Sequence, residues 1–196
     1  MIGPKIGHRL DPVFISVYRF IFRNTFVAPN TITIAGALFG FLAAFLIFFE
    51  HPVLGAVSLL VAGFLDILDG AIARGSGRVT QFGGFFDSVL DRYTDLSVMG
   101  AIIFVYVRHN QFDHALAGFI AAIGCALIPY ARARAEAASI SCKTGILERP
   151  ERTLFLLVGL FIPFLLNYIV IILAVLTHVT VIQRIVHVWR ETRRKA

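Results

Sequence analysis

Four aspartates lie within one short stretch of a chain that is otherwise strongly apolar. Asp66 and Asp69 are three residues apart, and Asp87 and Asp91 are four residues apart. An acidic side chain at membrane depth costs about 2.5 to 3.5 kcal/mol on insertion scales, so four of them would cost on the order of 10 kcal/mol without compensation. Any fold of this chain must therefore neutralise these carboxylates.

The spacing of the aspartates indicates how that is done. If both flanks are helical, each pair of aspartates lies on one face of its helix, and two antiparallel helices can bring the pairs together. All the ligand atoms of such a site are oxygens, with no His or Cys among them. The pattern therefore favours a hard divalent cation, Mg²⁺ first and Mn²⁺ second.

The composition places this site in a membrane protein. Hydrophobic residues make up 58% of the 196 residues and include 19 Phe, whereas soluble domains average about 45 to 50% apolar residues. We therefore expect an all-α integral membrane protein that forms a single domain over residues 1–196.

Apolar runs separated by turn residues predict six transmembrane helices. We place them at about 31–49, 53–73, 82–107, 113–131, 151–167 and 169–189, within a bundle at 29–190 that follows a juxtamembrane segment at 1–28. Residues 11–26 are too short and too charged to span. They suit an amphipathic helix in the membrane interface, and an ordinary leader to the first span is the alternative.

Two of the connections can also be read from the sequence. Asn30 or Thr31 can cap the first span. Pro163 and Asn167–Tyr168 are expected to form the short connection between the last two spans.

The basic residues predict the orientation. Of the 18 Lys and Arg, all but two fall on the side of the termini; Arg92 lies within a span and Arg108 on the opposite side. By the positive-inside rule, both termini and the aspartate-bearing turn face the cytoplasm of a cell membrane. The formal net charge of +6 then reflects topology and attraction to anionic lipid, and the chain has no platform for nucleic acid.

The residues around the aspartates add a phosphate-binding pattern. Gly70 follows Asp69 directly and lets a ligand approach the backbone, and Ala73 keeps the same face open. Arg74, one turn later, offers a planar fork of donors that matches a phosphate. A metal, an arginine and an open backbone together describe a pyrophosphate site.

The complete pattern, D-x-x-D-G-x-x-A-R-x8-G-x3-D-x3-D, resembles the signature of the CDP-alcohol phosphotransferase family. Its fixed positions are here Asp66, Asp69, Gly70, Ala73, Arg74, Gly83, Asp87 and Asp91. The resemblance implies a six-helix membrane enzyme in which an acceptor alcohol displaces CMP from a CDP-linked lipid. It also implies that Asp66, Asp69 and Asp87 bind two metal ions, and that Asp91 is the general base and a further metal ligand.

The resemblance also suggests which residues bind the substrates. A Pro-Asn-x-x-Thr stretch commonly opens the first span of the family and reaches the nucleotide, although a simple helix cap explains Asn30 equally well. The residues expected to bind CDP-diacylglycerol are Pro29, Asn30, Thr31, Gly70, Arg74, Thr80 and Gly83.

A basic segment after the fourth span suits an acceptor that carries a phosphate. The expected acceptor ligands are Arg132, Lys143, Arg149 and Arg152. The Gly-x-x-Glu-Arg-x-x-Arg pattern at 145–152 resembles the branch of the family that makes phosphatidylinositol phosphate from inositol phosphate. Glycerol 3-phosphate would also require arginines and serine fewer, and the cytoplasmic charge bias alone is a further explanation.

Two other classes of protein also place acids in a membrane. An intramembrane prenyltransferase uses D-D-x-x-D or N-D-x-x-D, and this chain has neither. A cation channel or transporter does not explain Gly70 and Arg74 at fixed positions after Asp69. The Gly36-x-x-x-Gly40 motif is a weak indication of a homodimer.

Overall fold

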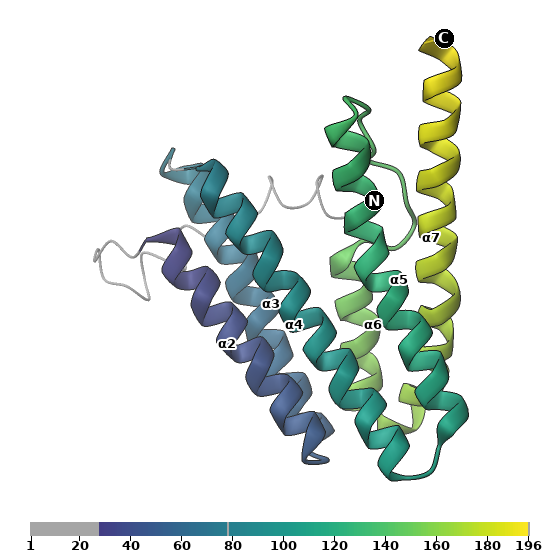
Figure 1. The fold of residues 1–196 in the computed structure, drawn as a ribbon. Helices are drawn as coiled ribbons and strands as arrows, with labels where there is room; N and C mark the ends of the chain where they lie inside the picture. Colours follow the sequence, from purple (N-terminus) through teal and green to yellow (C-terminus); the bar gives the residue numbers. More distant parts are fainter. Residues whose placement is uncertain (1–27, 78, 196) are drawn as a thin grey trace. The chain divides into compact units, whose positions relative to one another are not determined.

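The computed structural model describes residues 28–77 and 79–195, and every regular element in these residues is helical (Figure 1). The elements are α2 (Pro29–Phe48), α3 (Pro52–Gly75), α4 (Gln81–Arg108), α5 (Phe112–Ala137), α6 (Arg149–Phe161), the short 3-10 helix η1 (Pro163–Leu165) and α7 (Leu166–Lys195). The all-α fold is therefore confirmed for this part of the chain. The interfacial helix expected at 11–26 lies outside the described residues.

Four stretches are long and apolar enough to span a membrane, judged by length and composition. They are α2, α3, α5 and the stretch Pro163–Arg194, which contains η1 and most of α7. α4 is not among them, since its first half carries Asp87, Asp91, Arg92 and Asp95, and α6 has only 13 residues. The membrane character of the chain is thus supported, and the six spans stay a prediction.

Several helix ends differ from the expected ones. α2 begins at Pro29 with Ala28 as its N-cap, and no side chain caps this end. Pro29 explains this start, because its fixed φ suits the first helical position and its missing N–H needs no partner. α5 continues to Ala137, so Arg132 is helical. Pro163 lies in the connection between α6 and α7, as expected, because it begins η1, whereas Asn167–Tyr168 lie inside α7.

The chain forms two compact units that divide within α4, between Val98 and Met99. In the first unit α2 packs along α3, and Ile32, Leu68 and Ile72 form a buried cluster. A Cβ atom added at Gly36 would lie 3.4 Å from Leu65 Cβ, and one added at Gly40 would lie 2.7 Å from Thr94 Cγ2.

Both glycines of the Gly36-x-x-x-Gly40 motif therefore serve close packing of α2 against α3 and α4 within one chain. Small residues allow such close approach of helices in membranes. The motif gives no separate support for a homodimer, which stays a prediction.

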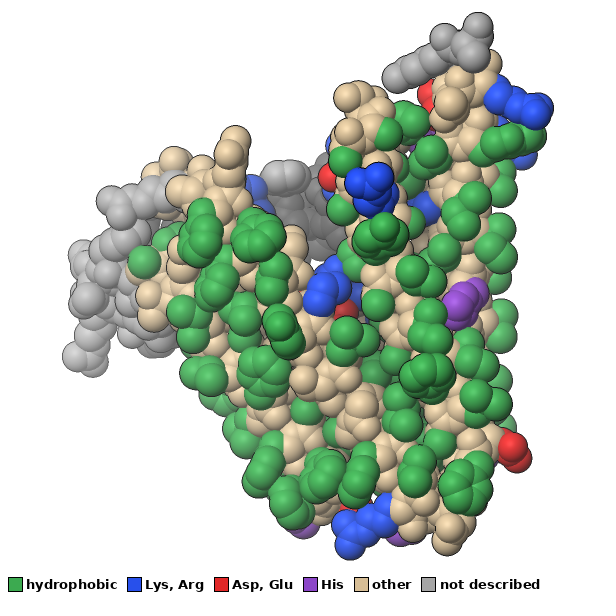
Figure 2. Space-filling model, in the orientation of Figure 1, with side chains coloured by type: hydrophobic (Ala, Val, Ile, Leu, Met, Phe, Trp, Pro, Cys, Tyr) green, Lys and Arg blue, Asp and Glu red, His purple; other side chains and the backbone are tan. Residues whose placement is uncertain are grey.

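In the second unit, α5 and α6 pack against α7. Large hydrophobic side chains stay exposed on both units, as Figure 2 shows for the visible faces; Leu38, Phe45, Leu116 and Phe119 are each more than half exposed. Apolar surface of this extent is unusual on soluble monomers and suits contact with lipid.

Candidate active site

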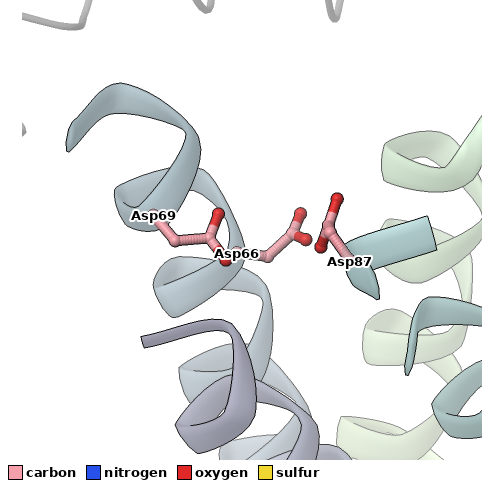
Figure 3. Close-up of side chains that lie close together, drawn as sticks. All are labelled: Asp66, Asp69 and Asp87. Carbon is pink, nitrogen blue, oxygen red and sulfur yellow. The ribbon is translucent and has the colours of Figure 1, made fainter. Parts of the chain in front are cut away.

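Two neighbouring helices bring three of the predicted metal ligands together. α3 presents Asp66 and Asp69, and α4 presents Asp87. One carboxylate oxygen of each residue lies within 4.8 Å of the others, and the carboxylates of Asp66 and Asp87 point toward one another (Figure 3). Asp69 is buried, and the other two are half-buried.

This cluster fits a hard divalent cation. Two unit charges about 5 Å apart repel by roughly 3 kcal/mol at an effective dielectric constant of 20, so three carboxylates at this separation require compensation. Within the described residues the group contains carboxylates alone, without His or Cys. Such an oxygen set is what Mg²⁺ and Mn²⁺ prefer.

Thr33 on α2 holds one of these carboxylates. Its Oγ1 lies 2.5 Å from Asp69 Oδ2 and 3.1 Å from the carbonyl oxygen of Pro29, so a single hydroxyl proton faces two acceptors. The shorter contact is the one to the charged acceptor, as expected of a charge-assisted hydrogen bond. Thr33 therefore fixes the orientation of the Asp69 carboxylate.

Sequence reasoning missed Thr33 and named Thr31 instead. Thr31 is exposed, whereas Thr33 is half-buried and faces α3 through its bond to Asp69. The signal was present, because Thr33 is the final residue of the Pro-Asn-x-x-Thr stretch that begins at Pro29.

Asp91 lies one turn after Asp87 on α4 and is half-buried. Its Oδ2 lies 3.7 Å from Nη2 of the adjacent Arg92. It is not one of the three carboxylates that gather within 4.8 Å. Its roles as general base and as metal ligand therefore stay predictions.

Gly70 and Arg74 are in contact on α3. A Cβ atom added at Gly70 would lie 3.0 Å from Arg74 Nη1. The glycine was expected to leave the backbone open to a ligand, and the structure adds a second reason for it: the missing side chain makes room for the guanidinium. Arg74 also lies in the last turn of α3, where a cation is favourable to the helix dipole.

Three of the residues expected to bind the CDP-lipid meet where α2 and α4 begin. The N–H of Gly83 donates to Thr80 Oγ1 at 3.0 Å, which is the usual bond of a helix N-cap. A Cβ atom added at Gly83 would lie 2.9 Å from Thr80 Oγ1 and 3.2 Å from Asn30 Oδ1. Two helix N-termini with polar side chains thus lie together, an arrangement that suits a phosphate or another anion.

The four residues predicted to bind the acceptor belong to the second unit. Arg149 and Arg152 lie in the first turn of α6; the former is half-buried and the latter only 3% exposed. Lys143 is exposed in the segment between α5 and α6. Arg132 donates from Nε to Glu136 Oε1 at 2.9 Å, one turn later on α5. Their roles toward an acceptor stay predictions.

Arg184, which in the sequence is one of the basic residues of the charge bias, has a definite place in the structure. Its side chain is buried; Nε donates to the carbonyl of Thr144 at 2.9 Å and Nη1 donates to the carbonyl of Ile128. Nη2 lies 3.9 Å from Glu148 Oε1. An arginine inside an apolar helix was the available signal, because such a residue needs buried partners.

A model of the CDP-alcohol phosphatidyltransferase family matches residues 26–182, which include all four aspartates. The chain belongs to this family. Membership makes it a transferase of substituted phosphate groups, as the aspartate signature predicts.

Relatives and solved structures agree with this assignment. The chain is 40% identical over 144 residues to the archaetidylinositol phosphate synthase of Methanothermobacter thermautotrophicus, and the alignment covers 71% of each chain. It is 34% identical over 169 residues to the phosphatidylinositol phosphate synthase of Corynebacterium glutamicum, covering 82% of this chain and 77% of that one.

The fold is similar to that of the Mycobacterium tuberculosis phosphatidylinositol phosphate synthase. The crystal structure of that enzyme with CDP-DAG bound has a TM-score of 0.80 and 28% identity, covering 91% of this chain and 92% of that one. A second structure of the same enzyme, in complex with manganese and citrate, has the same TM-score and identity.

Proposed function

We propose that the chain transfers the phospholipid group of CDP-diacylglycerol to inositol phosphate and releases CMP. The observation that carries this proposal is the cluster of Asp66, Asp69 and Asp87 in a member of the CDP-alcohol phosphatidyltransferase family. Support for the acceptor comes from the two relatives, both of which are named for an inositol phosphate product. The Gly-x-x-Glu-Arg-x-x-Arg pattern at 145–152 adds to it.

The metal site would be formed by Asp66, Asp69 and Asp87, with Asp91 as a further ligand of a Mg²⁺ pair that Mn²⁺ can replace. The manganese complex of the tuberculosis enzyme supports a divalent metal. When bound, the metal supplies positive charge that stabilises the phosphate oxygens in the transition state.

The protein groups would then bind and orient the two substrates. Arg74 donates to a phosphate oxygen of the CDP-lipid beside the Gly70 backbone. The helix N-termini near Asn30, Thr80 and Gly83 receive the nucleotide. Their neighbours Pro29 and Thr31 complete the expected set of nucleotide ligands.

Asp91 would serve as the general base. It takes the proton from the acceptor hydroxyl, whose oxygen forms a bond to the lipid-side phosphorus. The bond from this phosphorus to the CMP oxygen breaks, and CMP leaves with the bonding electron pair while Arg74 stabilises its charge.

The acceptor phosphate would be bound by Arg149 and Arg152 together with Lys143 and Arg132. Charge-assisted hydrogen bonds from arginine to phosphate are about twice as strong as neutral ones. The same chemistry with glycerol 3-phosphate, or with serine, is the alternative. Glycerol 3-phosphate would use the same arginines.

We propose that the chain is a multi-pass protein of the cytoplasmic membrane with six spanning helices. Both termini and the aspartate cluster face the cytoplasm, because nearly all basic residues fall on that side. This orientation releases CMP directly into the cytoplasm.

The test is CMP release by the purified protein with Mg²⁺ and CDP-diacylglycerol or its archaetidyl counterpart. Inositol 1-phosphate, glycerol 3-phosphate, serine and inositol are offered separately, and the lipid product is identified by mass spectrometry. We expect turnover with inositol phosphate and its loss in Asp87→Asn. If CMP is released with another acceptor alone, that acceptor replaces inositol phosphate in the proposal. If CMP is released with none of the four, the proposed reaction is overturned.

A further inference from the structure

One face of α7 carries a stripe of polar side chains. Thr180, Gln183, Arg184 and His187 follow the spacing i, i+3, i+4 and i+7, which places them on one side of a helix. We call these four residues the α7 clamp. Polar residues in an apolar helix are costly unless their hydrogen bonds are made within the protein.

Each residue of the clamp bonds to the backbone of residues 141–147, in the segment that connects α5 to α6. The contacts are the Leu147 N–H to Thr180 Oγ1 at 3.2 Å, the Ile146 N–H to Gln183 Oε1 at 3.2 Å, Arg184 Nε to the Thr144 carbonyl at 2.9 Å, and His187 Nε2 with the Ser141 carbonyl at 2.9 Å. Four side chains of one helix thus hold one segment through its main chain.

The contact is tightest around Gly145. Its φ is +141°, and a Cβ atom added there would lie 2.8 Å from Thr180 Cγ2. Thr180 is completely buried, as Leu147 nearly is. A glycine is required here for two reasons. A residue with a side chain would be strained at this positive φ, and its Cβ atom would clash with Thr180 on α7.

The held segment leads directly into the start of α6. Glu148 is the N-cap of this helix, and its N–H donates to Glu151 Oε2 at 3.2 Å in a capping box. The same Glu148 pairs with Arg184 of the clamp. The position of the first turn of α6, which carries Arg149 and Arg152, therefore depends on the contacts of the preceding segment with α7.

We propose that the α7 clamp positions the first turn of α6, so that Arg149 and Arg152 are held in place for the phosphate of the acceptor before it binds. This inference rests on the proposed function, and the clamp residues are positioning residues that act through the two arginines. A preorganised site binds more tightly because fewer groups must be ordered on binding.

The decisive variant is Thr180→Val, which keeps the shape of the side chain and removes the acceptor of the Leu147 N–H. Thr177→Val is the matched control. Thr177 is equally buried one turn earlier on α7, and among the described residues its hydroxyl bonds only to carbonyls of its own helix, at Leu173 and Ala174. Gln183→Leu is a second, less buried variant, and Thr180→Ser is the rescue.

We expect Thr180→Val to raise the KM for inositol phosphate by about 3- to 10-fold, the size of one intramolecular hydrogen bond. The KM for the CDP-lipid should match that of Thr177→Val. Gln183→Leu should act in the same direction, and Thr180→Ser should restore the wild-type KM. Hydrogen exchange of the Ile146 and Leu147 amides should be faster in Thr180→Val than in the control.

Two results would overturn the inference and can be told apart. If the wild-type protein turns over inositol phosphate but Thr180→Val and Thr177→Val change the acceptor KM equally, the clamp has only a structural role. If the wild-type protein turns over no phosphorylated acceptor, the proposed function fails and the clamp proposal fails with it.

Discussion

At the scale of single residues, the site depends on side chains that support the aspartates. Thr33 holds Asp69 from a different helix. Asp91 stands one turn beyond the three clustered carboxylates and beside Arg92. Each of these two positions gives a prediction.

Replacing Thr33 by Val should weaken metal binding without removing a ligand. Loss of a residue that orients a metal ligand typically costs about 10- to 100-fold in metal affinity or activity. We expect a loss of this size in Mn²⁺ affinity, measured by titration with electron paramagnetic resonance in the absence of substrates. Thr33→Ser keeps the hydroxyl and is the control; equal losses in both variants would contradict the role of the hydrogen bond.

Replacing Asp91 by Asn should abolish turnover while metal and CDP-lipid stay bound. Asn cannot accept the acceptor proton, and loss of a general base costs about 10²- to 10⁴-fold in rate. The measurement is single-turnover CMP release together with equilibrium binding of Mn²⁺ and of a CDP-lipid. If binding of the CDP-lipid is lost as well, Asp91 acts as a structural ligand and not as the base.

At the scale of the elements, the region that we expect to bind the nucleotide is made of helix ends. Thr80 caps α4 through Gly83, and Asn30 in the first turn of α2 lies against the same glycine. The two helix starts approach closely because Gly83 has no side chain. Its neighbour Gly84 has a different environment, since no described atom lies within 4 Å of a Cβ atom added there.

This difference makes Gly83→Ala and Gly84→Ala a matched pair. Overpacking of a close contact costs about 1 to 3 kcal/mol, so Gly83→Ala should push Asn30 and Thr80 apart and raise the KM for the CDP-lipid by about 5-fold or more. Gly84→Ala should leave this KM within about twofold and slightly stabilise α4, because Ala is the better helix former. Both values come from steady-state kinetics with varied CDP-lipid. An equal rise in both variants would point to a general disturbance of α4.

At the scale of the whole molecule, the family match extends across both compact units. The apolar surface and four long apolar helices support a membrane protein. The charge distribution predicts which side each turn occupies.

Cysteine labelling can test this topology. Cys125 and Cys142 are first replaced by Ala, and single cysteines are then placed at Asn110, between α4 and α5, or at Ser76, after α3. We expect a membrane-impermeant maleimide to label intact cells at position 110 and to label position 76 only after the membrane is opened. Labelling of both positions from the same side would contradict the six-span arrangement.

The sequence by itself determined the fold class and the composition of the candidate metal site. The i, i+3 spacing of Asp66 and Asp69 puts two carboxylates on one helical face whatever the surroundings. The signature through Asp87 identified the family. The apolar runs located the helices, and most of the helix ends were placed within a few residues of the observed ones.

Only the tertiary structure decided which supporting contacts form. Thr33 rather than Thr31 contacts Asp69, the guanidinium of Arg74 fills the space above Gly70, and Arg184 joins the α5–α6 segment to α7. The physical reason is that these contacts depend on how each helix is rotated about its axis. In helices that are apolar on most faces, hydrophobic periodicity carries little information about that rotation. In the folded chain, the observed rotation of α2 goes with close contacts between small residues, such as Gly36 and Gly40, and their neighbours.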